Sequence, residues 1–152
     1  MSVRVGEADF DAGVEIKVLT DGRRDVGGVA TFIGLVRDRN EGTGVSDLTL
    51  EHYPGMTEKA LNAIEQQARE RWPLIDVTII HRVGRLSPGD QIVFVGTTSA
   101  HRAAAFEACD FIMDYLKTEA PFWKAETTAE GETRWVEARA SDDEAKRRWA
   151  TD

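Results

Sequence analysis

The chain has 152 residues, of which 41% are hydrophobic and 30% charged, as in an ordinary globular protein that buries a core without disulfides. Its formal charge of −8 argues against non-specific binding to nucleic acids or anionic membranes, so an anionic ligand needs a local cluster of basic residues. The single cysteine excludes an intrachain disulfide, and because we find neither a signal-peptide pattern nor a membrane-length apolar run, we expect a cytoplasmic protein.

The first half of the chain predicts two strands followed by a helix. Residues 27–37 are β-branched and glycine-spaced like a buried strand, and residues 38–47 predict a polar, mobile loop. Residues 48–53 alternate as a short strand. Thr57 is then predicted to cap a helix that ends near Trp72.

The middle of the chain predicts a hairpin and a long helix. Residues 77–83 and 91–98 have strand character, and residues 87–89 form the expected turn. Ser99 is a candidate cap for a helix over residues 103–117. That helix is apolar nearly all round, so we expect it to be central and packed on more than one side.

The last part of the chain predicts an extended segment and a terminal helix. Pro121 ends the central helix and redirects the backbone into a segment that carries Lys124. A short apolar patch follows at residues 134–136. Ser141 with Glu144 is a capping-box pattern, which predicts a helix in the C-terminal tail from about residue 141.

These elements favour the α+β class. Helices and strands are interspersed, but the hairpin and the short strands predict a mostly antiparallel sheet rather than a doubly wound parallel one. We therefore expect a single domain over residues 1–152, with a long central helix.

Two lysines are the most informative residues for chemistry. Lys117 and Lys124 lie in the run FIMDYLKTEAPFWKAE, which is otherwise rich in aromatic and aliphatic side chains. An ammonium group drawn into an apolar wall loses hydration, and its lowered pKa suits it to proton transfer. The alternative is that both lysines lay their stems on apolar surface and keep their charges in water.

Other cationic residues are candidates for binding an anion. His101 and Arg102 start the central helix, where backbone amides and the helix dipole favour negative charge; an acidic neighbour of Arg102 is the alternative explanation. Arg37 ends the first strand, after Gly34, and Arg139 lies near the C-terminus. Each of these two is also compatible with a solvated surface residue.

Several other chemistries are not supported. The three histidines fall on different elements without close ligand partners, so a zinc site is not predicted. The sequence contains no GxxxxGK[ST] or GxGxxG phosphate loop and no GxSxG nucleophile. Cys109 lies in an apolar helical pattern, which favours a buried, inert thiol over a nucleophile.

A family resemblance is carried by LTLEHYPGMTEKAL, RWPL, VTIIHRVGRLSPGD, QIVFVGTTSAHRAAAFEA, FIMDYLKTEAPFWKAE and RWVEAR. Between about Gly27 and Arg139, the chain resembles the large, catalytic subunit of molybdopterin synthase. The resemblance implies a hammerhead-type fold and a central homodimer within a heterotetramer. It also implies a small ubiquitin-like partner whose C-terminal thiocarboxylate supplies sulfur to cyclic pyranopterin monophosphate, forming the dithiolene of molybdopterin, with no metal or cofactor bound.

The resemblance also assigns residues to the site. Lys117 and Lys124 are the implied catalytic residues. Our hypothesis is that Lys117 lies beside the thioacyl carbon, and that Lys124 orients the pterin and moves protons. The implied substrate-binding set is Leu35, Val36, Arg37, His101, Arg102, Lys117, Lys124, Ala125, Glu126 and Arg139. Ala125 departs from the family, because many relatives carry a basic residue there, and Glu119 also occupies a position that can be basic.

Two alternatives from other functional classes remain open at this point. A non-catalytic module that docks a ubiquitin-like tail would need the same apolar and cationic surface without the chemistry. A stand-alone enzyme acting on a phosphorylated metabolite would need the anion site without a protein partner.

Overall fold

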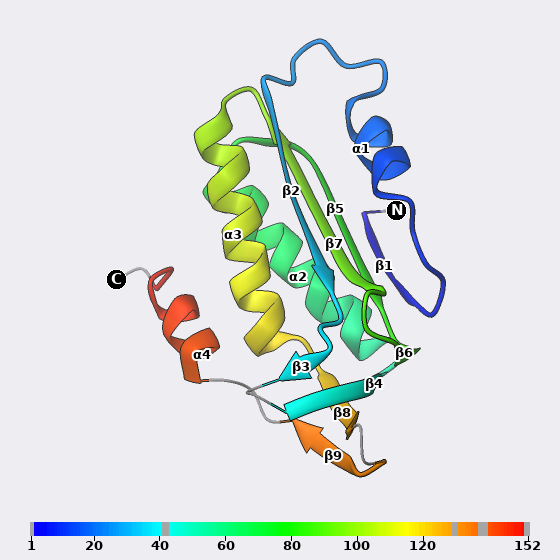
Figure 1. The fold of residues 1–152 in the computed structure, drawn as a ribbon. Helices are drawn as coiled ribbons and strands as arrows, with labels where there is room; N and C mark the ends of the chain where they lie inside the picture. Colours follow the sequence, from blue (N-terminus) through cyan, green and yellow to red (C-terminus); the bar gives the residue numbers. More distant parts are fainter. Residues whose placement is uncertain (1, 41–42, 129–130, 137–139, 151–152) are drawn as a thin grey trace.

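The computed structural model describes residues 2–40, 43–128, 131–136 and 140–150, which form two sheets and four helices (Figure 1). In chain order the elements are β1 (Val3–Gly6), α1 (Ala12–Thr20), β2 (Gly28–Leu35), β3 (Arg39–Asn40), β4 (Thr43–His52), α2 (Met56–Arg71), β5 (Leu74–Arg82), β6 (Gly84–Leu86), β7 (Gln91–Ser99), α3 (Arg102–Glu119), β8 (Phe122–Thr128), β9 (Thr133–Val136) and α4 (Ala140–Arg147).

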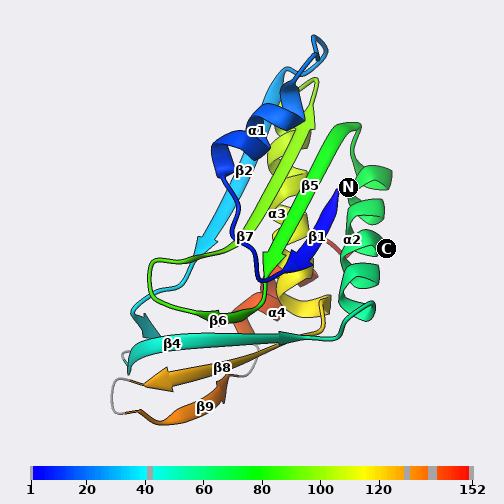
Figure 2. The same cartoon turned by 90° about the vertical axis from the view of Figure 1, so that its right-hand side faces the viewer.

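The first sheet has the strand order β1-β5-β7-β2 and lies between helices. α2 and α3 cover one face and α1 the other (Figure 2). Beneath α2 and α3 the core includes Ile64, Ile79 and Phe111, whereas Leu19 and Phe94 form the smaller core under α1. Apolar residues on both faces of the central strands are therefore buried, as the unbroken apolar run of residues 91–98 requires.

The second sheet has the order β3-β4-β8-β9, with β6 also paired to β4, and it crosses below one end of the first sheet (Figure 2). All its pairings are antiparallel. A separate apolar cluster, in which Val36, Leu50 and Leu86 are buried, fills the junction between the two sheets. Lys124, one of the two predicted catalytic residues, lies on β8 at this junction.

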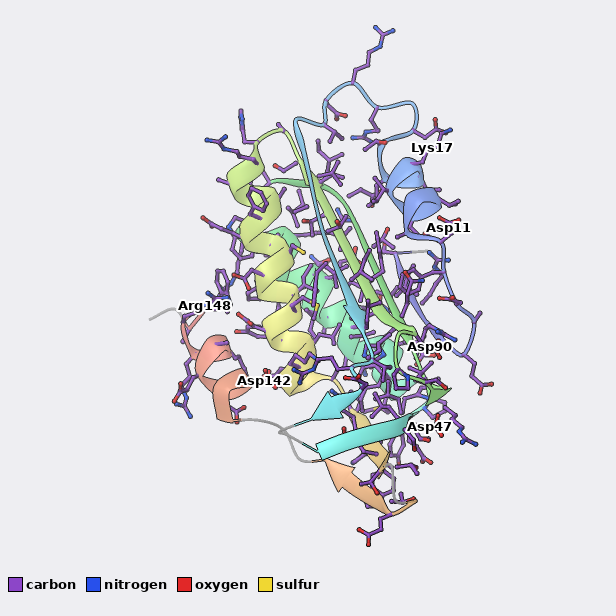
Figure 3. The ribbon with its side chains drawn as sticks, in the orientation of Figure 1. Asp11, Lys17, Asp47, Asp90, Asp142 and Arg148 are labelled. Atoms are coloured by element: carbon purple, nitrogen blue, oxygen red, sulfur yellow. The ribbon has the colours of Figure 1, made fainter. Side chains whose placement is uncertain are left out.

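The structure confirms the α+β class with mostly antiparallel pairing. The exception is β1, which pairs in parallel with β5. Neither β1 nor α1 was predicted, because both are short, and β1 becomes a strand only through its pairing with a distant segment. α1 begins where the Asp11 carboxylate, labelled in Figure 3, accepts a 3.1 Å hydrogen bond from the Val14 amide.

The prediction of a loop over residues 38–47 is wrong. β3 and β4 take up most of that segment, and Val45 and Asp47 pair in register with Thr128 and Thr127 of β8. The polar side chains that suggest a loop belong to a strand whose partner lies some 80 positions further along the chain, so no local pattern reveals it.

The three predicted helix caps are also wrong, since α4 begins at Ala140, one residue before the predicted cap Ser141. Thr57 lies inside the first turn of α2, where its hydroxyl accepts from the Tyr53 amide and donates to the Pro121 carbonyl. Ser99 is the last residue of β7, and its hydroxyl donates to the Pro73 carbonyl at 2.9 Å. Each hydroxyl therefore ties its element to a distant loop instead of satisfying a helix end.

α3 is the central helix that the sequence predicts. It contacts β2, β7, α2 and α4, and its buried residues include Phe111, Ile112 and Leu116. Cys109 is 7% exposed, and burial raises the pKa of its thiol to about 12, which makes it a poor nucleophile. Over the described residues, none of the helices combines the length and the hydropathy needed to cross a membrane.

The predicted terminal helix is α4, and the residues after it are anchored to α2 and α3. The Trp149 ring meets Trp72 and Phe111 edge to face, each with ring centroids 5.6 Å apart, and its Nε1 donates to the Asp114 carboxylate. Arg148, labelled in Figure 3, pairs with the same carboxylate at 2.8 Å. A tryptophan thus holds the end of the described chain against the central helix.

Trp149→Ala should lower the free energy of unfolding by roughly 2–3 kcal/mol, because it removes two ring contacts and leaves the half-buried Asp114 carboxylate with fewer donors. Urea unfolding measures the change. Trp135→Ala is the matched control, since that side chain is 64% exposed and should cost less than about 1 kcal/mol. Equal losses in the two variants would contradict the anchoring role of Trp149.

Candidate functional site

Lys117 and Lys124 approach one place from two different elements, as the sequence predicts. Lys117 lies in the exposed last turn of α3, and Lys124 is half-buried on β8. The helix ends at Glu119, and Pro121 turns the chain into β8. The break at Pro121 therefore lets a helix end and a strand present their charges to the same region.

Both lysines act electrostatically on one buried residue, His81 on β5. Its ring is 5% exposed and stacks on Phe122, with centroids 3.8 Å apart and planes 20° from parallel. Its Nδ1 lies 2.8 Å from the Arg82 carbonyl oxygen. Burial lowers the pKa of His81 to about 3, and the positive charges of Lys117 and Lys124 act in the same direction.

The register of β4 and β8 shows which side chains share the face of Lys124. Side chains alternate along a strand, and residues directly opposite one another point to the same face. The pairs on this face are Phe122 with His52, Lys124 with Leu50, and Glu126 with Leu48. Leu50 is 1% exposed and Glu126 is 5% exposed, so Lys124 projects from the core-facing side of the second sheet.

Ala125 lies on the opposite face of β8 from Lys124. It pairs in register with Thr49 and Trp135 and is itself buried, whereas Trp123 on the same face is 47% exposed. A longer side chain at this position would point away from the space between the two lysines. The departure at Ala125 from the family pattern therefore does not alter the cations that face Lys124 within this chain.

At the end of β2, residues 35–37 include one buried side chain and two exposed ones. Val36 is 6% exposed and belongs to the apolar cluster at the sheet junction. Its backbone is held by Gly89 and Asp90, which exchange hydrogen bonds with it at 2.8 and 2.9 Å. Leu35 and Arg37 are exposed on either side, so they are the two residues of this segment whose side chains can meet a ligand.

His101 and Arg102 lie at the far end of α3 from Lys117. At 1.5 Å per residue, Arg102 and Lys117 are separated by about 22 Å along the helix. Both residues are exposed beside the start of β2, where Gly27 passes so close that a Cβ there would lie 1.9 Å from the Ala100 oxygen. A single chain therefore does not bring these cations to the lysines (Figure 1).

The remaining predictions concern Arg139 and metal binding. Arg139 lies outside the described residues, so its place relative to the lysines stays a prediction. Within the described ranges, no group of three or more His, Cys, Asp or Glu residues is arranged to hold a metal ion.

The sequence did not single out His81 or Phe122 as site residues. His81 lies within the apolar run VTIIHRV, and this position is a signal in the sequence that points to it. Burying a polar ring in a strand costs free energy unless the ring is hydrogen-bonded, so a histidine at such a position suggests a functional role.

The comparisons with known proteins agree on one family. The family model described as "MoaE protein" matches residues 5–119. A molybdopterin synthase catalytic subunit from Ralstonia nicotianae is 62% identical over 148 residues, which is 97% of this chain and 84% of that protein. One from Escherichia coli is 62% identical over 145 residues, or 95% of each. The solved molybdopterin biosynthesis MoaE protein from Burkholderia ambifaria superimposes with a TM-score of 0.84 at 53% identity, covering 99% of both chains.

Acid should destabilise the fold through His81. Its pKa is 6.5 in an unperturbed chain and about 3 when folded, so between these values the unfolded chain binds a proton that the folded chain does not. Stability at this site is therefore complete above about pH 6.5 and is lost as the pH falls toward 3. His81→Gln removes this contribution.

Urea unfolding of both proteins at about pH 7.5 and about pH 5 measures the effect, and the variant should lose less stability on acidification than the wild type. The carboxylates common to both proteins cancel in the comparison. An equal loss would show that His81 does not resist protonation in the folded state.

Proposed function

The chain belongs to the MoaE protein family, and on that basis we propose that it is the catalytic subunit of molybdopterin synthase, acting as one domain in the cytoplasm. In this reaction a small ubiquitin-like partner brings its C-terminal thiocarboxylate to the subunit. Sulfur is transferred from that group to cyclic pyranopterin monophosphate, and two such transfers build the dithiolene of molybdopterin. The subunit is thus a sulfurtransferase that works only with its partner.

One observation carries the proposal: Lys117 and Lys124, on two different elements, both act electrostatically on the same buried histidine. A thiocarboxylate and a phosphorylated pterin are both anionic, so a chain with a net charge of −8 needs this local cluster of positive charge to hold them. Lysines supply charge and transferable protons together.

The two lysines have different surroundings, which fits different roles. Lys117 is exposed at a helix end, where a flexible tail from a partner can reach it, and we assign it to the thioacyl carbon. Lys124 is half-buried on the core-facing side of β8, and we assign it to orienting the pterin and moving protons during sulfur addition.

A homodimer would complete the anion site. Arg102, Phe106, Met113 and Lys117 follow one another at helical spacings of four, seven and four residues, so they share one stripe of α3. A two-fold axis near the middle of that stripe reverses the direction of the helix in the second copy. It would bring Arg102 and His101 of one subunit to the Lys117 end of the other.

The surface along this stripe is compatible with such a dimer. Phe106 is 64% exposed on α3. The neighbouring edge strand β2 exposes Val29 and Ile33 on the face of the sheet that α1 covers, and Leu35 near its end is 52% exposed. Apolar side chains on an unpaired edge strand are unusual on a protein that stays monomeric. They support a self-association surface at the edge of the first sheet, next to α3.

Two other functions compete with this proposal. A module that only docks a ubiquitin-like tail would lose affinity but no catalysis when the lysines are removed. A stand-alone enzyme for a phosphorylated metabolite would turn over without any partner protein. The buried neutral histidine near two lysines favours the enzyme, since docking an anionic tail requires positive charge but no buried hydrogen-bond acceptor.

Lys117→Ala and Lys124→Ala should each lower dithiolene formation by at least about 100-fold, because each removes a charge and a proton donor from the reacting groups. The measurement is product formation from purified chain, thiocarboxylated carrier and cyclic pyranopterin monophosphate. Size-exclusion chromatography should show that both variants still assemble with the carrier. Lys59→Ala, on the exposed surface of α2, is the control and should retain the wild-type rate. Full activity in both site variants would overturn the assignment.

Mixed dimers test the site across two subunits. Lys117→Ala and Arg102→Ala chains, each carrying a different purification tag, are combined and the mixed dimer is isolated. One of its two sites then has both lysines and the arginine intact, so at low pterin concentration about half of the wild-type rate should return, although each variant alone is deficient. No recovery in the mixed dimer would show that Arg102 does not act across the interface.

A further inference from the structure

We propose that His81 is a positioning residue for the sulfur-transfer site, offering an unprotonated ring nitrogen, Nε2, that orients the ammonium groups of Lys117 and Lys124. The inference rests on the proposed function and adds to it a residue on β5, a strand that carries none of the residues assigned so far.

The backbone fixes which nitrogen carries the proton. A carbonyl oxygen can only accept a hydrogen bond, so the 2.8 Å contact between Nδ1 and the Arg82 carbonyl places the hydrogen on Nδ1. In a neutral imidazole the other nitrogen then has a lone pair. Nε2 is therefore a hydrogen-bond acceptor in the folded protein.

The ring is held so that this acceptor cannot turn away. His81 stacks on Phe122 with centroids 3.8 Å apart, and Phe122 pairs in register with His52. Phe122 and Lys124 are two residues apart on the same face of β8, so their backbones are about 6–7 Å apart. The imidazole thus lies next to the strand position from which Lys124 projects.

The surroundings keep the ring neutral. Its register partners on β1 and β7 are Val5 and Val93, which offer no charge. The charged and titratable groups that act on it are Lys117 from α3, Lys124 from β8 and His52 from β4, and all three disfavour an imidazolium. The Arg82 guanidinium is engaged with the carbonyl oxygens of Glu7 and Gln91.

A purely structural role does not account for this residue. The stack on Phe122 and the hydrogen bond from Nδ1 to the Arg82 carbonyl give the ring a structural role, but neither of them uses Nε2. A neutral acceptor beside two ammonium groups has a clear use. It can accept hydrogen bonds that orient their N–H bonds, without adding a like charge.

Three variants separate the two nitrogens. His81→Asn places an amide near the position of Nδ1, where it can donate to the Arg82 carbonyl, but it does not reach the position of Nε2. His81→Gln reaches the position of Nε2 with an amide oxygen. His81→Phe keeps the ring stack on Phe122 and removes both nitrogens. Carrier binding and thermal unfolding establish that each variant is folded.

The experiment measures kcat and KM for cyclic pyranopterin monophosphate, using the complex with the thiocarboxylated carrier. We expect kcat of the Asn and Phe variants to fall roughly 10- to 100-fold with KM within about threefold, and the Gln variant to recover at least about a fifth of the wild-type kcat. The pH profile of kcat should also shift in the Asn and Phe variants, because the lysines lose their acceptor.

Two results would overturn the proposal: wild-type kcat in the Asn or Phe variant, or equal kcat in the folded Asn and Gln variants. An inactive wild-type complex is a different outcome, since it removes the proposed function itself. If the wild-type complex is active and the Asn and Gln variants have equal kcat, only the positioning role of His81 is refuted.

Discussion

The stacking of His81 on Phe122 joins the two sheets of this protein, and the candidate site depends on it. His81 belongs to the long sheet through β5, and Phe122 begins β8 in the crossing sheet. Their 3.8 Å contact closes the junction directly below the end of α3. Together with the turn at Pro121 and the apolar cluster at the junction, it fixes the helix end that carries Lys117 relative to the strand that carries Lys124.

The same junction explains why charge is tolerated there. Lys124 projects from a face whose neighbour Leu50 is 1% exposed, and an ammonium group in such surroundings is costly unless it is compensated. A neutral imidazole supplies a lone pair without a competing positive charge, the Glu126 carboxyl group shares the face of Lys124 on β8, and Lys117 adds a second positive charge from α3. The local arrangement therefore suits a ligand that arrives with negative groups, in a protein whose overall charge repels them.

The length of α3 fixes the distance between the cationic residues at its two ends. Because a helix has a fixed rise, it holds Arg102 about 22 Å from Lys117 in every copy of the chain. No side chain spans that distance, so cations at both helix ends serve one ligand only if a second subunit supplies one of them. The sequence predicts which element carries each of these cations, but it does not predict how far apart they lie in the folded chain.

The sequence by itself determined the elements that local pattern controls. The break at Pro121, the long apolar helix and the strands at residues 77–83 and 91–98 follow from backbone restriction and side-chain periodicity, and these act over a few residues. The family, too, is recognisable from the sequence alone. Tertiary structure decided everything that depends on distant partners: β4 forms against β8, Ser99 bonds to Pro73, and His81 meets Phe122. Those contacts join residues far apart in the chain, and their free energy is gained only once the fold has brought them together.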